Sequence, residues 1–284
     1  MTRQPALARR AEDLLGAAVI ATAPVAGGDI CTANRLRLSD GRVVLIKTHP
    51  HPPEGFFEAE ARGLDWLRVD GGVPVPEVLA VDHDCVIIPW VEPGKVNNES
   101  ATRFGAALAV THLSSPTSYG LEHDGYIGRL PLPNTTAPTW AEFFATRRVL
   151  PYLKVAADRG HLTPDHVTII EGLVNRLEDL LPEEAPSRLH GDLWNGNVLW
   201  GSDTRVWLID PAAYAGHREA DLAMLALFGM PNLPRVLDAY QEAAPLTDGW
   251  EDRVGLHQLF PLLVHAAMFG GTYGARAAAI AAKF

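Results

Sequence analysis

Two carboxylates and one carboxamide between positions 190 and 210 have the types and spacing that a group-transfer reaction needs. Asp192 and Asn197 are separated by four residues in a polar loop, and Asp210 ends the apolar run that follows. A positioned carboxylate can take the proton of an attacking hydroxyl group. Amide and carboxylate oxygens suit Mg²⁺, which neutralises phosphate charge. These side chains could therefore orient an acceptor hydroxyl and a metal-bound phosphate for phosphoryl transfer.

The spacing within this loop matches the catalytic loop of kinases. In that loop the pattern H-R-D-x-x-x-x-N places a carboxylate at the acceptor hydroxyl and an asparagine at the metal, and a later aspartate is the second metal ligand. Here His190-Gly191-Asp192 opens the pattern and Asn197 closes it. An ordinary turn would explain the glycine and the asparagine, but not Asp210 as well. We predict Asp192 as the catalytic residue, Asn197 and Asp210 as metal ligands, and ATP and Mg²⁺ as cofactors.

Lys47 is the candidate for binding nucleotide phosphates. It ends the apolar run VVLIK at 43–47, which parallels the V-A-I-K strand of kinases. The helix expected over 57–69 carries Glu58 and Glu60, and kinases use a glutamate at such a place to fix the lysine head group. Spacing alone leaves the choice between the two glutamates open.

A turn in the first hairpin is the second candidate for nucleotide binding. Gly27 and Gly28 lie between the first two expected strands, over 19–25 and 35–38. Residues without a Cβ let the backbone lie close to phosphate groups. We predict that both glycines contact the nucleotide.

The third candidate is the hinge that follows the strand expected over 85–90. In a kinase-like fold this segment passes the adenine, so Trp90, Val91 and Glu92 are predicted to bind the nucleotide. The preceding Pro89 has no N–H to donate. Val91 is therefore the expected donor.

Periodicity predicts an α+β fold in two lobes. Strands with a leading helix at 4–16 and the helix at 57–69 are expected in an N-terminal nucleotide-binding lobe, residues 1–92. A helical catalytic and substrate lobe, residues 93–284, follows. The remaining elements expected are strands at 42–48 and 78–81, a helix from 102 to about 115, a long loop at 115–139, helices at 139–158, 164–181, 219–228, 234–243 and 250–269, and a terminal helix.

Composition limits the partners and the compartment. With 24 basic and 34 acidic residues the formal net charge is −10, which disfavours nucleic acid and anionic membranes as partners. The two cysteines form neither a disulfide framework nor a metal motif, which favours a reducing compartment. Arg9-Arg10 imitates a twin-arginine signal, but Glu12 and Asp13 interrupt the run. We expect a cytoplasmic protein, present as a monomer or weak homodimer.

The chain resembles the fructosamine kinase (ketosamine-3-kinase) family, a branch of the aminoglycoside phosphotransferase-like and protein-kinase-like superfamily. The likeness extends from about residue 7 to the end. It rests on these segments: GGDICTANRLRL at 27–38, DGYIGRLPLPN at 124–134, HGDLWNGNVL at 190–199, LIDPAAYAGHREADLAML at 208–225 and LLVHAAMFGG at 262–271. The loop pattern alone indicates only the superfamily, and the segments at 124–134 and 216–221 narrow it to the family.

This resemblance implies a function and further site residues. Glu60 matches the glutamate of the family's Glu-Ala-x-Gly-Leu pattern, so it is preferred to Glu58 as the partner of Lys47. The substrate would be a ketosamine, free or on a glycated protein, phosphorylated at the sugar C3 hydroxyl, and Trp194 and His265 would contact it. An indole or a carboxylate would suit the substrate's ammonium group.

Two alternatives compete with this reading. Another small-molecule kinase of the same fold, of the aminoglycoside or choline type, would differ in the loop at 115–139 and in the residues after Asp210. A nucleotide-binding pseudoenzyme would lack one of Lys47, Asp192, Asn197 and Asp210, and all four are present.

Overall fold

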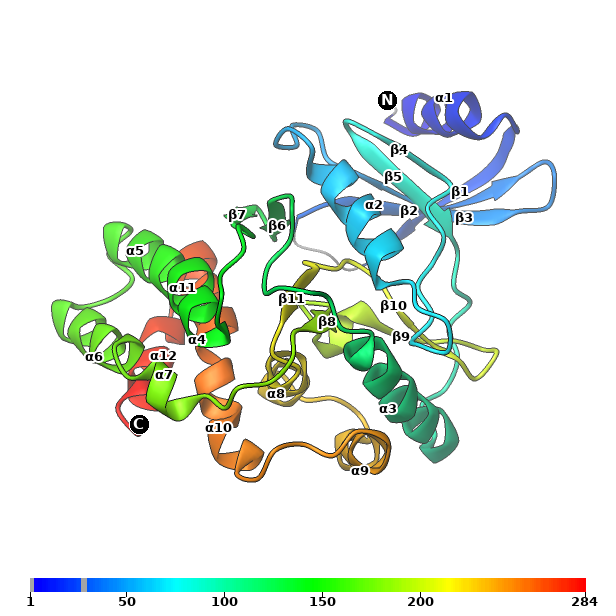
Figure 1. Ribbon diagram of the computed structural model, residues 1–284. Helices are drawn as coiled ribbons and strands as arrows, with labels where there is room; N and C mark the ends of the chain where they lie inside the picture. The colour runs from blue at the N-terminus through cyan, green and yellow to red at the C-terminus, as the bar shows by residue number, and fades with distance from the viewer. Residues whose placement is uncertain (1–2, 27–29) are drawn as a thin grey trace.

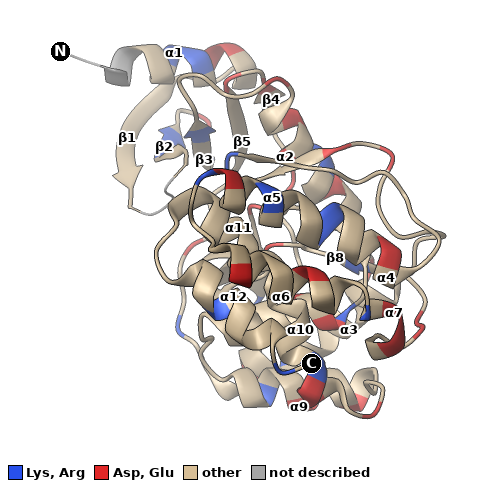
Figure 2. Cartoon of the chain, turned by 90° about the vertical axis from the view of Figure 1, so that its left-hand side faces the viewer, with Lys and Arg blue, Asp and Glu red and all other residues tan. Residues whose placement is uncertain are grey.

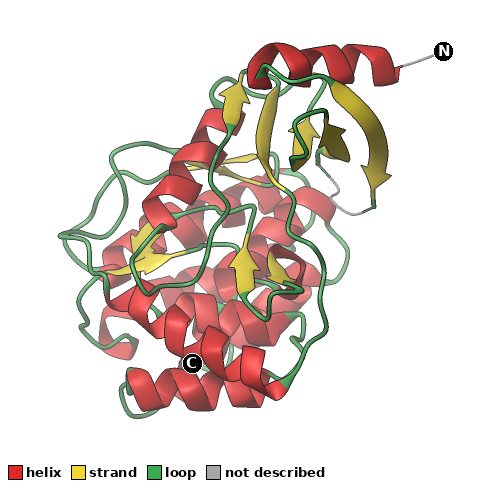
Figure 3. Ribbon diagram, turned by 90° about the vertical axis from the view of Figure 1, so that its right-hand side faces the viewer, coloured by secondary structure: helices red, strands yellow, loops and turns green. Residues whose placement is uncertain are grey.

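The computed structural model describes residues 3–26 and 30–284 and divides them between two lobes (Figure 1). The smaller lobe holds a five-stranded antiparallel sheet, and Figure 3 shows that helices dominate the larger lobe, with short strand pairs among them. This confirms the predicted α+β class with two lobes. The smaller lobe contains α1 Arg3–Leu15, β1 Val19–Val25, β2 Thr32–Leu38, β3 Val43–Thr48, α2 Phe56–Leu67, β4 Ala80–Asp82 and β5 Cys85–Pro89.

The larger lobe contains most of the helices and three short strand pairs, β6 with β7, β8 with β11, and β9 with β10. Its elements are α3 Asn98–Leu113, β6 Gly125–Ile127, β7 Leu130–Leu132, α4 Trp140–Phe143, a π-helical turn Phe144–Val149, α5 Leu150–Asp158, α6 Pro164–Val174, α7 Leu177–Leu180, β8 Ser187–Leu189, a 3₁₀ turn Asn195–Asn197, β9 Val198–Trp200, β10 Val206–Leu208, β11 Tyr214–Gly216, α8 Glu219–Leu227, α9 Leu233–Ala243, α10 Trp250–His257, α11 Leu259–Phe269 and α12 Tyr273–Ala281.

The central strand β3 is buried on both faces of the sheet, whose strand order is β1-β2-β3-β5-β4. Successive side chains of a strand point to opposite faces. Val44 and Ile46 accordingly pack with Ala11 of α1, while Leu45 packs with Phe57 of α2 on the other face. Lys47 follows the same alternation and lies on the α2 face, which is turned toward the larger lobe. The strand thus delivers one charged residue to the junction of the lobes.

Several boundaries differ from those the sequence predicted. Helix α3 begins at Asn98, not at residue 102, because the Asn97 side chain accepts a hydrogen bond from the Ser100 amide and caps the helix. The segment 115–139 is not one loop, since it contains the β6–β7 hairpin. Three of the expected helices are each divided in the structure. The helix expected over 139–158 consists of α4, the π turn and α5, and the helix expected over 164–181 consists of α6 and α7. The helix expected over 250–269 consists of α10 and α11.

Figure 2 shows acidic and basic residues interspersed over α1, α5 and α9 on the face it presents. No described helix combines the length and the hydrophobicity that a membrane crossing requires.

Helices α3 and α9 pack closely at Gly105, which is buried in α3. A Cβ at this position would lie 2.1 Å from the Val236 carbonyl oxygen of α9, which is far inside van der Waals contact. Gly172 on α6 is the opposite case, since a Cβ there meets no heavy atom within 4 Å.

We predict that Gly105→Ala lowers the free energy of unfolding by about 1 to 3 kcal/mol, because the two helices must separate to admit the methyl group. Gly172→Ala is the matched control and should raise stability by up to about 1 kcal/mol, since alanine favours helix over glycine. Urea denaturation of both variants measures the difference. Equal effects of the two substitutions would contradict close packing at Gly105.

Candidate active site

One buried carboxylate binds the backbone of the loop between β8 and β9. Asp221 of α8 is 1 % exposed, and its two oxygens accept hydrogen bonds from the His190 amide at 2.7 Å and the Gly191 amide at 3.0 Å. Hydrogen bonds to a charged acceptor are stronger than those between neutral groups. Gly191 has a φ of 78°, and a Cβ there would lie 2.0 Å from the Ala212 carbonyl oxygen, so glycine is required.

His190 braces this loop against the strand that carries Asp210. Its ring Nε2 donates to the Ile209 carbonyl oxygen at 2.8 Å, and its Nδ1 accepts from the Asp192 amide at 3.3 Å. Burial lowers the pKa of this imidazole, which favours the neutral form that can both donate and accept. This geometry gives His190 a bracing role in the loop.

Asp192 and Asn197 lie against each other. The Asn197 Nδ2 donates to the Asp192 backbone oxygen at 2.8 Å and to its carboxylate Oδ2 at 3.1 Å, and the Asn197 amide oxygen accepts no hydrogen bond from the described part of the chain. Burial raises the pKa of Asp192 to about 7, although the hydrogen bond from Asn197 acts in the opposite direction. A carboxyl group with this pKa can exchange a proton near neutral pH.

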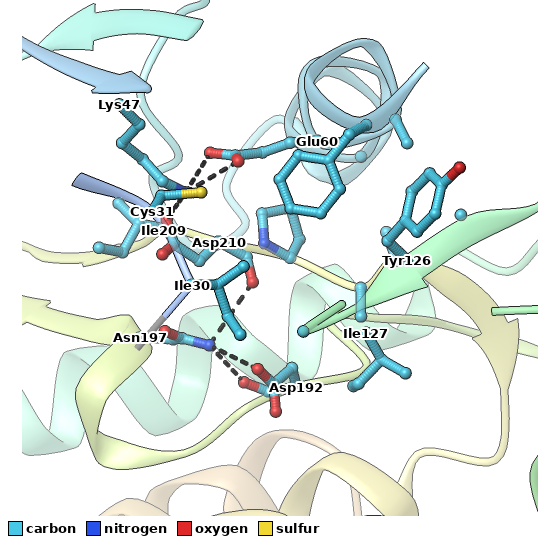
Figure 4. A pocket seen from close by; sticks show the side chains of 18 of the residues that line it. Ile30, Cys31, Lys47, Glu60, Tyr126, Ile127, Asp192, Asn197, Ile209 and Asp210 are labelled. Carbon is cyan, nitrogen blue, oxygen red and sulfur yellow. Dashed lines mark hydrogen bonds and ion pairs between the residues drawn. The ribbon is translucent and has the colours of Figure 1, made fainter. Parts of the chain in front are cut away.

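Lys47, Glu60 and Asp210 form an ion cluster around the buried Lys47 side chain, as Figure 4 shows. The Lys47 ammonium lies 2.8 Å from both carboxylate oxygens of Glu60 and 2.8 Å from the Asp210 Oδ1. Burial alone would lower the pKa of this ammonium group, but the charges of Asp210 and Glu60 outweigh burial and hold it above its ordinary value. Lys47 is therefore a fixed positive charge.

Asp210 has a backbone conformation that is rare for residues other than glycine, with a φ of 55°. It directly follows β10 and Ile209, whose amide donates to the Asn197 carbonyl at 3.1 Å. Such a conformation persists only where neighbouring contacts impose it. The result is that the Asp210 carboxylate faces Lys47 and the loop of Asp192.

One cavity of about 760 Å³ lies at the junction of the lobes, and its wall includes the ion cluster of Lys47 and the pair Asp192 and Asn197, while the supporting Asp221 and His190 lie outside it. Most of the residues predicted from the sequence are on its wall, namely Lys47, Glu60, Trp90, Val91, Asp192, Trp194, Asn197, Asp210 and His265. Gly27 and Gly28 lie outside the described residues. Ile30 and Cys31, the next described residues of that hairpin, line the cavity, and burial raises the pKa of the Cys31 thiol to about 11.

Glu92 is the predicted site residue that does not line this cavity. Its carboxylate accepts hydrogen bonds from the Trp90 indole at 2.9 Å and from Arg35 at 3.3 Å, and its carbonyl accepts from Ser202. It lines a second, adjacent cavity instead. The structure therefore brings Trp90 and Val91, but not the Glu92 side chain, to the main cavity.

Two of the residues that line the cavity, Trp194 and His265, flank the ring of Phe228. Trp194 is 40 % exposed and lies 6.2 Å from Phe228, which lies 4.9 Å from His265, measured between ring centroids. The His265 Nδ1 is bonded to the Pro261 carbonyl oxygen of its own helix at 2.7 Å. This bond fixes the orientation of the His265 ring, which is part of the cavity wall.

Sequence reasoning left one structural part of the site undecided and missed another. From its position at a helix start, Asp221 could serve either the helix N-terminus or the catalytic loop, and it binds the loop backbone directly. The β6–β7 hairpin was expected to be a loop, yet Tyr126 and Ile127 line the cavity (Figure 4). The turn-forming Gly128, with a φ of 55°, was the available signal for the hairpin.

A model of one protein family, described as fructosamine kinase, matches residues 4–284. The chain belongs to the fructosamine kinase family. It is similar to a probable ketoamine kinase of Thermus thermophilus, with 38 % identity over 255 residues that cover 88 % of each protein. It is also similar to the crystal structure of a candidate fructosamine-3-kinase from Thermobifida fusca, with 48 % identity, 97 % and 96 % of the two chains covered and a TM-score of 0.92.

A more distant likeness concerns the fold of this fructosamine kinase family member. A streptomycin–ATP complex of an aminoglycoside phosphotransferase is 12 % identical, covers 100 % of this chain and 97 % of its own, and gives a TM-score of 0.64. The predicted kinase-like fold is thereby confirmed. The chain is an ATP-dependent phosphotransferase of this family.

The ion cluster around Lys47 includes Glu60 but not Glu58, the other glutamate of α2. We predict that Glu60→Gln lowers kcat/KM for ATP by on the order of tenfold, because Lys47 loses one of its two charged partners. Glu58→Gln, two residues away on the same helix and outside the cavity wall, should change it by less than about twofold. Steady-state kinetics with varied ATP measures both. A larger effect of Glu58→Gln would overturn the assignment.

Proposed function

We propose that this kinase transfers the γ-phosphoryl group of ATP to the C3 hydroxyl of a ketosamine. The observation that carries the proposal is the shared cavity, whose wall includes Lys47 and Asp210 together with Asp192 and the aromatic residues Trp194 and His265. Part of this wall has the charges that phosphates require, and part has rings that suit a sugar or an ammonium group. The family match supports the choice of a ketosamine.

In this proposal Asp192 is the group that orients the acceptor hydroxyl and takes its proton. Its pKa of about 7 supports the role, since a base works best when its pKa is near the operating pH. Asn197 holds the carboxylate in place through its Nδ2. Asn197 is buried, and the partly exposed Asp192 carboxylate lines the cavity where the acceptor would bind.

Asn197 and Asp210 are proposed to hold Mg²⁺. Their donor set fits a small hard cation, because the amide oxygen of Asn197 accepts no hydrogen bond within the described chain and only one oxygen of Asp210 is bonded to Lys47. When bound, the ion neutralises the phosphate oxygens during transfer. Lys47, which Glu60 fixes, binds the phosphates from the other side.

The nucleotide base is proposed to lie at the hinge, with its edge against the backbone of Trp90 and Val91. The Trp90 amide already donates to the Val43 carbonyl at 3.0 Å, so Val91 is the better donor. Gly27 and Gly28 remain proposed phosphate contacts. We also propose residues 1–92 as the nucleotide-binding lobe and 93–284 as the substrate lobe.

Both cysteines are free thiols, which suits the cytoplasm as the proposed compartment. There the substrate would be a free ketosamine or a ketosamine on a glycated protein. Because Trp194 is 40 % exposed, the part of the cavity wall that it forms is open to solvent.

The substrate proposal is tested by comparing cationic acceptors. We predict that kcat/KM is at least about tenfold higher on fructosyl-lysine or ribulosyl-lysine than on kanamycin, a difference of roughly 1.4 kcal/mol in transition-state binding. A coupled ADP-release assay measures turnover, and phosphorus NMR of the product should place the phosphate at C3. Asp192→Asn serves as the inactive control. Preferential phosphorylation of kanamycin would indicate a kinase of the aminoglycoside type instead.

The metal proposal has a separate test that does not depend on turnover. We predict that Mg²⁺ strengthens ATP binding to the wild-type protein but not to Asp210→Ala, because that variant lacks the carboxylate proposed to hold the ion. Calorimetric titration of ATP with and without Mg²⁺ measures the difference. Asp158→Ala removes an exposed carboxylate of α5 and should behave as wild type. An unchanged Mg²⁺ dependence in Asp210→Ala would place the metal elsewhere.

A further inference from the structure

The segment that leads into the β6–β7 hairpin carries two carboxylates on the cavity wall. Glu122 and Asp124 both line the cavity that also contains Asp192 and Trp194. No Lys or Arg among the described residues forms an ion pair with either of them, whereas Glu60 and Asp210 are both paired with Lys47. Arg148 is near enough to Asp124 for their charges to interact, but neither carboxylate is in direct contact with a cation of the described chain.

Asp124 is fixed in place and Glu122 is not. The Asp124 Oδ1 accepts a hydrogen bond from the Asn134 amide at 2.7 Å, and within the described chain the Glu122 carboxylate accepts none. Asn134 is 1 % exposed, and its carbonyl accepts from Leu121 while its Nδ2 donates to the His123 carbonyl. The segment 121–124 is thus folded around one buried asparagine.

Arg148 of the π turn fixes that asparagine in turn. Its guanidinium is fully buried and donates to the Asn134 Oδ1 at 2.6 Å and to the Pro133 carbonyl at 2.7 Å. It stacks 3.8 Å above the Tyr214 ring centroid, where a cation is stabilised by the aromatic face. A fully buried cation whose direct partners are neutral is costly. That cost is explained if Arg148 serves to hold the carboxylate-bearing segment.

We propose that Asp124 is the specificity-determining residue that binds the ammonium group of the acceptor, and that Asn134 and Arg148 position it. The inference rests on the proposed function and extends it, because it assigns the cationic part of the substrate to one side chain. A carboxylate with one oxygen fixed by a backbone amide presents its other oxygen in a defined direction. An ammonium group leaving water for the cavity requires such a partner.

The test uses two acceptors that differ only in charge. Fructosyl-butylamine carries a secondary ammonium group, and 1-O-butyl-fructose has a neutral ether oxygen in its place. Wild type should show a kcat/KM at least about tenfold higher on the amine than on the ether. Asp124→Asn should lower this ratio to about one while it changes kcat/KM on the ether by less than about twofold. Glu122→Gln, which removes the same charge two residues away, should retain the wild-type ratio.

The positioning residues are tested with the same ratio. Arg148→Met should lower the amine-to-ether ratio severalfold, and Arg148→Lys should recover little of it, because an ammonium group cannot reproduce the two hydrogen bonds of the guanidinium fork. Leu173→Ala on α6 is the control for lost stability, since it creates a buried cavity away from the hairpin and should leave the ratio unchanged. The ratio in wild type should also fall with added salt, because Asp124 is exposed.

The outcomes distinguish a failure of the proposed ammonium site from a failure of the proposed function. If wild type phosphorylates both acceptors at equal rates, the ammonium site is refuted and the proposed function stands. If Asp124→Asn lowers both rates equally, or Glu122→Gln abolishes the ratio, Asp124 is not the recognition residue. If wild type phosphorylates neither acceptor, the proposed function fails, and this inference fails with it.

Discussion

The burial of the Lys47 ammonium group is the constraint on which the rest of the site depends. A charged group removed from water must be neutralised by nearby partners. Its two partners come from different parts of the chain, Glu60 from α2 and Asp210 from the end of β10, each at 2.8 Å. The lysine therefore fixes the sheet, the helix and the catalytic segment relative to one another. The same charge that holds the lobes together is available to phosphate.

A second carboxylate organises the catalytic loop in a similar way. Asp221 gathers the amides of His190 and Gly191, and the His190 ring then ties the loop to Ile209 beside Asp210. The loop and the segment that carries Asp210 are thus connected through one imidazole. The acceptor side has its own support, since Arg148 and Asn134 hold the hairpin that forms the opposite wall. Three polar networks, each centred on a buried charge, define three sides of one cavity.

The sequence was sufficient where a short pattern carries the chemistry. Asp192, Asn197, Asp210 and Lys47 stand in local motifs, and periodicity predicted the two-lobed α+β fold and most of its helices and strands. It failed where contacts connect distant segments. The bonds from Asp221 to the loop span about thirty residues, and no local pattern separates a carboxylate that caps a helix from one that binds a backbone far away. The hairpin strands β6 and β7 have three residues each, too few for alternation to show.

The π turn at Phe144–Val149 interrupts the helical run between α4 and α5. A π turn contains about one residue more than an α-helical turn, and both complete one full turn, so α4 and α5 keep their relative orientation whether or not the extra residue is present. Arg147 and Arg148 within the turn and Tyr152 beyond it donate to backbone oxygens of Thr135, Pro133 and Pro131. Removal of the extra residue would therefore change the turn that holds Arg147 and Arg148 and leave the orientation of α5 and Tyr152 unchanged. The irregularity is local, and its consequence is confined to how the two arginines of the turn reach the segment 133–135.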